Sequence, residues 1–143
     1  MELRFRALVP HAVLPQRARA ADAGLDLFAA EEADVGPGHR AMIPTGVAVE
    51  IPDGHAGLVL PRSGLASRRG LTLANAPGLI DAGYRGEIAC AMVNLDRSET
   101  VHVDLGDRIA QLVVVRVPDA HPVWAEELRA SERGAGGFGS TGA

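Results

Sequence analysis

The chain contains no lysine, and all 14 of its basic residues are arginine. This absence excludes Schiff-base catalysis and the lysine of a phosphate-binding loop. Arginine offers instead a planar fork that suits bidentate contacts to phosphate. The formal net charge of −4 argues against nucleic-acid binding through a broad basic face, yet it permits a small anionic ligand held by a few arginines.

Cysteine is also scarce, because Cys90 is the single one and an internal disulfide is therefore impossible. It lies in the apolar run of residues 88–93, where we expect a small buried core residue. A chain without disulfides favours a reducing compartment, so we expect a cytoplasmic protein. No stretch reaches the roughly 20 apolar residues of a membrane span, and residues 1–6 carry no apolar run of signal length. We expect no membrane partner.

Aromatic residues make up only 3% of the chain, so the core must consist of valine, leucine, isoleucine and alanine. At 143 residues the chain is long enough for one domain. Short apolar or alternating runs separated by glycine, proline and aspartate turns occur at residues 47–51, 56–60, 88–95, 101–105 and 109–117. Many short strands with frequent turns predict an all-β sandwich, jelly roll or barrel.

Two segments are compatible with short helices. Residues 63–69 lie between Pro61 and Gly70, with Ser63 available as the N-cap and Gly70 at the end. Residues 124–132 are rich in alanine and glutamate, which favours one or two helical turns. Trp124 at the start of that segment is interpreted as a packing anchor.

Residues 75–87 are the most informative segment, because they combine Asn75, Asp81, Tyr84 and several glycines in a turn region. Asp81 follows the apolar pair of residues 79–80, so we expect it where a short strand runs into a turn. A carboxylate held on a stiff turn beside an exposed tyrosine is a plausible general base. The alternative is a turn aspartate that hydrogen-bonds its own backbone.

Other polar residues allow two interpretations each. Residues 61–64 could form an anion site at a helix start or a plain serine cap. Gln111 lies within an apolar strand and needs partners, which either backbone or a ligand could supply. Asp26 lies between apolar neighbours, and the sequence favours a structural role with a core arginine over proximity to a metal. Residues 107–108 look like an adjacent charge pair of structural origin.

The last residues differ from the rest, because residues 133–142 contain five glycines and cannot build a core. A disordered tail is the simple interpretation. However, arginine, hydroxyl groups and free backbone N–H groups are what phosphate oxygens require. Residues 134–139 match a G-x-G-x-x-G pattern without the preceding strand or following helix of a dinucleotide-binding fold, so we reject that fold.

Taken in order, these pieces resemble the five motifs of the trimeric deoxyuridine triphosphate nucleotidohydrolases (dUTPases). The motifs are residues 23–27, 61–66, 75–87, 106–112 and 133–142. The resemblance implies a distorted jelly-roll subunit with one short helix over residues 1–132. It also implies a glycine-rich C-terminal arm, residues 133–143, that closes over a neighbouring subunit's site. The assembly would be a homotrimer with three shared active sites, and no nucleic acid would be bound.

The resemblance implies hydrolysis of dUTP to dUMP and pyrophosphate, which supplies dUMP for thymidylate synthesis and keeps uracil out of DNA. Asp81 would be the general base for a water that attacks the α-phosphorus. Asn75 and the backbone at Leu79 and Ile80 would read the uracil edge. Tyr84 would pack under the deoxyribose and exclude a 2′-hydroxyl. Ala89 stands where family members often carry a longer side chain near the uracil, so a contact there would come from backbone.

The phosphate-binding residues follow from the remaining motifs of the same resemblance. Ser63 and Gly64 would bind the bridging region of the phosphates with Arg62 close by, and Gln111 would contact the α-phosphate. Mg²⁺ would be held mainly by the triphosphate and water, with Asp26 touching it only through water. In the C-terminal arm the expected substrate-binding residues are Arg133, Ser140 and Thr141 on the γ-phosphate, Phe138 over the uracil, and Gly139.

Two alternatives remain. A deoxycytidine triphosphate deaminase, or a bifunctional enzyme, shares the resemblance in fold, but its catalytic glutamate would stand at Ala91, where this chain has no acid. A non-catalytic interaction module on the same scaffold predicts losses in the motifs. No such loss is found at Asp81, Tyr84, Gln111 or Arg133.

Overall fold

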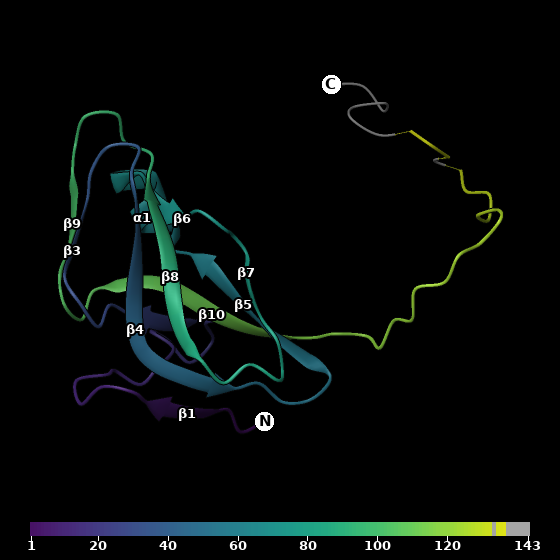
Figure 1. The fold of residues 1–143 in the computed structure, drawn as a ribbon, viewed down its shortest axis with the longest axis horizontal. Helices are drawn as coiled ribbons and strands as arrows, with labels where there is room; N and C mark the ends of the chain where they lie inside the picture. The colour runs from purple at the N-terminus through teal and green to yellow at the C-terminus, as the bar shows by residue number, and fades with distance from the viewer. Residues whose placement is uncertain (133, 137–143) are drawn as a thin grey trace.

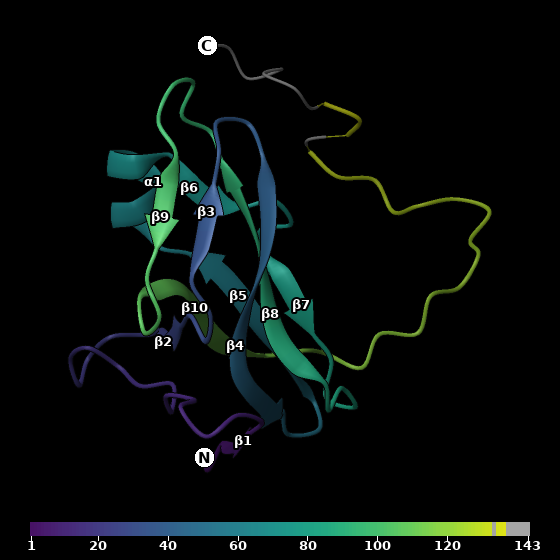
Figure 2. The same cartoon turned by 60° about the vertical axis from the view of Figure 1, so that its left-hand side comes forward.

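The computed structural model describes residues 1–132 and 134–136, and within them it contains ten short strands and one helix. The all-β prediction with one short helix is confirmed. The strands and the helix pack into one body, which Figures 1 and 2 show from two sides. The elements in order are β1 (Arg4–Ala7), β2 (Leu25–Phe28), β3 (Ala33–Val35), β4 (Arg40–Glu50), β5 (His55–Pro61), α1 (Ser63–Arg69), β6 (Leu71–Leu73), β7 (Gly78–Ile80), β8 (Glu87–Asn94), β9 (Val101–Val103) and β10 (Arg108–Arg116).

Two four-stranded antiparallel sheets form the body, in the strand orders β1-β4-β8-β6 and β2-β10-β5-β7, with a separate ribbon of β3 and β9. Neighbouring strands come from distant parts of the chain, which is the connectivity of a jelly roll. Figure 2 shows β4 and β8 crossing in front of β5 and β10. In the part of the chain that the structure describes, no helix has the length and apolarity that a bilayer span requires.

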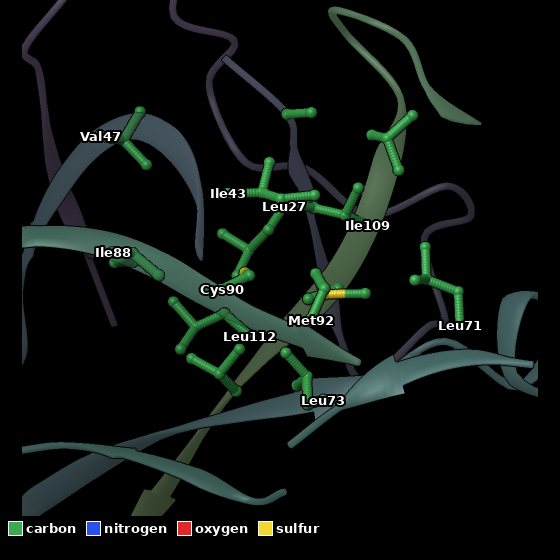
Figure 3. Close-up of a cluster of buried hydrophobic side chains, with 14 of the residues drawn as sticks. Leu27, Ile43, Val47, Leu71, Leu73, Ile88, Cys90, Met92, Ile109 and Leu112 are labelled. Atoms are coloured by element: carbon green, nitrogen blue, oxygen red, sulfur yellow. The ribbon is translucent and has the colours of Figure 1, made fainter. Parts of the chain in front are cut away.

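The core between the sheets is aliphatic, as the low aromatic content predicts. Leu27, Ile43, Met92, Ile109 and Leu112 are at most 1% exposed and meet in the centre of the body (Figure 3). Cys90 lies among them and is 1% exposed, so its expected burial is confirmed. Burial raises the pKa of its thiol to about 12, because the thiolate would lose its hydration. Cys90 is therefore an inert core residue rather than a nucleophile.

Helix α1 forms where the sequence places it, but it begins differently. The N-cap residue is Arg62, in extended conformation with φ −91° and ψ 124°, and no side chain caps the helix. The expected Ser63 N-cap is therefore wrong, because Ser63 is already the first helical residue. The C-terminal end agrees with the prediction, since Gly70 adopts the left-handed conformation with φ 65°.

The segment after β10 contradicts two predictions. No helix forms at residues 124–132, and Trp124 is fully exposed, at 103%, instead of packed. Figures 1 and 2 both show residues 118–132 running away from the body, so no surface is available to pack an apolar helical face. A helix of that length gains too little from its own hydrogen bonds to form in water without such packing.

Candidate functional site

A small cavity opens between β7 and β8, and we call it the β7–β8 cavity. Its volume is about 130 Å³, close to the roughly 150 Å³ that holds a benzene-sized ring. Aliphatic side chains of β5, β6 and β8 form part of its wall, and Asn75, Tyr84 and Glu87 supply polar groups. A cavity of this size with a few polar groups suits one flat heterocyclic ring.

Five residues that the sequence predicts for base and sugar recognition line this one cavity: Asn75, Leu79, Ile80, Tyr84 and Ala89. They come from the loop before β7, from β7 itself, from the following turn and from β8. Glu87 and Gly78 also line it, and sequence reasoning did not single them out. Their position inside the motif of residues 75–87 was the available signal.

The turn after β7 places Tyr84 and Asp81. The backbone N–H of Tyr84 donates to the carbonyl of Asp81 at 3.0 Å, which closes a four-residue turn. The Tyr84 hydroxyl donates to the carbonyl of Glu87 at 2.9 Å, so the phenol is fixed against the start of β8. Its side chain remains accessible, since Tyr84 is 45% exposed.

The Asp81 carboxylate is exposed at the end of β7, as the sequence predicts. Within residues 1–132 and 134–136 the structure records no hydrogen bond or ion pair to this carboxylate; the backbone carbonyl closes the turn instead. The interpretation of Asp81 as an aspartate bonding its own backbone is therefore wrong. The carboxylate lines a hollow of about 470 Å³ that adjoins the β7–β8 cavity through Leu79 and also includes His55 and Asp119.

A second hollow, the β2–β10 hollow, has a volume of about 410 Å³ and gathers the residues predicted for phosphate binding. The end of β5 and the start of α1 supply Arg62, Ser63 and Gly64. Strand β10 supplies Gln111, and β2 supplies Asp26, which lies opposite Gln111 in the antiparallel register. This hollow and the β7–β8 cavity share no lining residue.

Asp26 is held between two arginines. Its Oδ1 accepts from Arg62 Nε at 3.1 Å and its Oδ2 from Arg108 Nη1 at 3.2 Å. Arg62 Nη1 also donates to the carbonyl of Arg108 at 3.2 Å. The structural interpretation of Asp26 is confirmed. The interpretation of residues 107–108 as an adjacent charge pair is wrong, because Arg108 pairs with Asp26 while the Asp107 carboxylate accepts from the backbone N–H of Asp104.

The side-chain amide of Gln111 lies between the backbone carbonyl of Pro61 and Gly24. Its Nε2 donates to the carbonyl of Pro61 at 3.0 Å, so backbone satisfies the amide donor without a ligand. A Cβ added at Gly24 would lie 2.5 Å from Gln111 Oε1. Gly24 therefore allows this loop to approach the Gln111 side chain closely, and Gly24, Gln111 and Arg62 all line the hollow.

Asp26→Asn should lower the free energy of unfolding, because the two arginines would lose their shared carboxylate. The Asp26 side chain is 13% exposed, while those of Arg62 and Arg108 are 27% and 47% exposed. We expect a loss of about 1–2 kcal/mol, between the values for exposed and buried pairs, measured by urea denaturation. Glu2→Gln, which breaks the exposed pair with Arg4, should change little. Equal stability of Asp26→Asn and wild type would contradict this account.

The donor atoms in the two regions do not build a metal cage. Among the described residues no group of three histidine, cysteine, aspartate or glutamate side chains could hold a metal ion. Both oxygens of Asp26 already accept from arginine. A divalent cation near this hollow would need most of its oxygen ligands from a bound anion and water.

The predicted residues Arg133, Phe138, Gly139, Ser140 and Thr141 lie outside the described part of the chain.

Comparison with known proteins points to one family. The dUTPase family profile matches residues 11–142. The deoxyuridine 5′-triphosphate nucleotidohydrolase of Thermobifida fusca is 52% identical over 142 residues, which cover 99% of this chain and 79% of that protein. The corresponding protein of Cutibacterium acnes is 55% identical over 134 residues, which cover 94% of this chain and 88% of that protein.

Solved structures agree with the sequence comparisons. The dUTPase of Staphylococcus bacteriophage 80alpha with dUpNHpp superposes with a TM-score of 0.91 at 34% identity, covering 99% of both chains. A mutant dUTPase of phage phi11 of S. aureus superposes with a TM-score of 0.84 at 31% identity, covering 91% of this chain and 100% of that one. That phage phi11 structure concerns the coordination of a structural Mg(II) ion.

Proposed function

The chain belongs to the dUTPase family, and from this premise we propose that it hydrolyses dUTP to dUMP and pyrophosphate. The observation that carries the proposal is the ring-sized cavity lined by Asn75 and Tyr84, with the Asp81 carboxylate on the turn between β7 and Tyr84, unpaired among the described residues. Relatives at about half identity over nearly the whole chain are named for this substrate, which supports the same chemistry here.

In this proposal the β7–β8 cavity binds the uracil ring. Asn75 and the backbone at Leu79 and Ile80 read the polar edge of the base, and the small volume disfavours a purine. Tyr84 lies at the sugar, where its ring leaves a 2′-hydroxyl without space or a partner. An unpaired buried hydroxyl costs more than a lost contact, so a ribonucleotide is disfavoured.

The triphosphate lies along the β2–β10 hollow in the same proposal. The guanidinium of Arg62 and the N-terminal turn of α1 with Ser63 and Gly64 supply donors for phosphate oxygens. Gln111 reaches the α-phosphate with its amide. Arg133, Ser140 and Thr141 bind the γ-phosphate, and Phe138 with Gly139 closes over the base.

Asp81 acts as general base on a water molecule. The water oxygen attacks the α-phosphorus, its proton passes to the Asp81 carboxylate, and the bond from the α-phosphorus to the bridging oxygen breaks. Pyrophosphate leaves with the electron pair of that bond. Alignment of water and phosphorus, together with neutralisation of phosphate charge, supplies most of the rate acceleration in such a reaction.

Mg²⁺ fits this site as a cation that the substrate's phosphate oxygens would bind. When bound to the triphosphate it neutralises phosphate charge, and the chain offers no competing cage within the described residues. Asp26 would contribute indirectly, because its carboxylate holds Arg62 at the hollow, and a cation bound there would reach it only through water.

Separate binding regions support a shared site. The base cavity and the phosphate hollow have no lining residue in common, as expected if one substrate spans two subunits. We therefore propose a homotrimer in which each site combines the β7–β8 cavity of one subunit with the β2–β10 hollow of the next. The C-terminal arm of the third subunit completes the site.

Product analysis tests the proposed function. The protein is mixed with Mg²⁺ and dUTP, and in parallel with dCTP and UTP, and the products are separated by anion-exchange chromatography. We expect dUMP and pyrophosphate from dUTP, with little turnover of the other two. Ammonia released from dCTP would identify a deaminase instead. An absence of turnover with every substrate would contradict an enzymatic role.

A further inference from the structure

Strand β4 carries a bulge opposite the start of β8. Pro44 pairs with Ala89 and Ala48 with Glu87, so β4 has three intervening residues where β8 has only Ile88. Gly46 lies in this bulge with φ 69°, and a Cβ there would lie 2.6 Å from Val9 Cγ2. The bulge is therefore fixed both by its backbone conformation and by its packing.

The bulge holds the first two residues of β8 through polar contacts. Thr45 Oγ1 donates to the carbonyl of Ile88 at 2.6 Å, in a buried position. The backbone N–H of Gly46 donates to Glu87 Oε1 at 2.7 Å. A hydrogen bond to a carboxylate is about twice as strong as one between neutral groups, so Glu87 is the stronger of the two anchors.

Glu87 also connects the bulge to the sugar end of the cavity. Its backbone carbonyl accepts the hydroxyl of Tyr84, and both residues line the β7–β8 cavity. A second connection from this turn to β4, between Arg85 and Glu50, spans 3.7 Å between side chains that are 55% and 49% exposed. Such an exposed pair contributes little, so Glu87 makes the stronger of these two side-chain contacts to β4, while its carbonyl holds the Tyr84 hydroxyl.

We propose that Glu87 is a positioning residue for sugar discrimination: its carboxylate, anchored on the β4 bulge, fixes the carbonyl that holds Tyr84 in place. This inference rests on the proposed function, because it assigns Tyr84 to the deoxyribose. It gives Glu87, which lines the β7–β8 cavity, a role that acts through Tyr84, and it places part of the selectivity in strand β4.

The experiment compares Glu87→Ala with Glu87→Gln. Alanine removes the acceptor for Gly46, whereas glutamine keeps an acceptor oxygen and removes only the charge. The ratio of kcat/KM for dUTP to that for UTP should fall roughly fivefold in Glu87→Ala, the factor that one neutral hydrogen bond is worth, and by a smaller factor in Glu87→Gln, whose neutral oxygen makes the weaker bond. Glu32→Ala, at an exposed glutamate outside the cavity, is the matched control.

A double-mutant cycle separates positioning from a general loss of packing. Tyr84→Phe removes the phenol donor, so adding Glu87→Ala to it should cause no further loss of selectivity. An equal fivefold loss in both backgrounds would overturn the proposal. So would an unchanged dUTP to UTP ratio in Glu87→Ala alone.

A readout that does not depend on activity distinguishes this inference from the proposed function. Tyr84 is the single tyrosine of the chain, so ring-labelled tyrosine gives one set of NMR signals. Glu87→Ala should shift them most and Glu87→Gln less, while Glu32→Ala should leave them unchanged. Shifted signals in a protein that does not hydrolyse dUTP would retain the positioning of Tyr84 and reject the proposed function. Unshifted signals would reject the positioning itself.

Discussion

Asp81→Asn should reduce kcat for dUTP by about 10²–10⁴-fold, the usual contribution of a general base. Asparagine keeps the size of the side chain but cannot accept the proton of the attacking water. Because the carboxylate makes no hydrogen bond or ion pair within the described residues, its replacement should leave the fold and the substrate affinity intact. Steady-state kinetics and titration with a non-hydrolysable imido analogue of dUTP measure the two effects separately.

Asp119→Asn is the matched control for this variant. Asp119 is an exposed carboxylate that lines the same hollow as Asp81, so its removal makes a similar change in local charge. We expect Asp119→Asn to turn over dUTP at nearly the wild-type rate. Near-normal turnover in Asp81→Asn, or an equal loss in both variants, would refute the assignment of Asp81.

Removal of residues 133–143 should lower kcat by about 10²-fold or more, because the proposed γ-phosphate donors and the aromatic cover of the base are lost together. The proposed trimer should persist, since β1 to β10 are unchanged and the core lies between their sheets. Light scattering measures the assembly, and kinetics with dUTP measure turnover.

Removal of Ala143 alone controls for the change of terminus, since the fifth motif ends at residue 142. This shorter deletion should be as active as the full chain. A protein lacking residues 133–143 with wild-type kcat would show that the glycine-rich segment takes no part in catalysis.

Local patterns predicted β5, β8, β10, the end of β4 and the short strands β7 and β9, but not β1, β2, β3 or β6. β4, β5, β8 and β10 carry long apolar runs that bury one or both faces, so their pattern was visible. β1 has the polar sequence RFRA and is mostly exposed; its pairing with β4 fixes it as a strand. A partner strand decides such an edge segment, and a single sequence does not reveal that partner.

In the candidate site, too, contacts within one segment were predictable and contacts between distant segments were not. Residues of one continuous motif, such as Asn75 and Tyr84, were correctly expected to be neighbours because the chain itself joins them. An arginine partner for Asp26 was expected, but which arginines was not foreseen, since Arg62 and Arg108 lie 36 and 82 residues further along. Helix propensity also failed to predict residues 124–132, because no other part of the described chain packs against an apolar face there.

The exposed segment after β10 has a practical consequence. Trp124 is the chain's single tryptophan and is fully exposed, so in a lone subunit its fluorescence should resemble that of the free amino acid in water. Val123 and Leu128 nearby are 84% and 90% exposed, which makes this stretch an apolar surface that subunit association can cover. The wavelength of tryptophan emission, followed as the protein is diluted, is thus an intrinsic optical signal for that association.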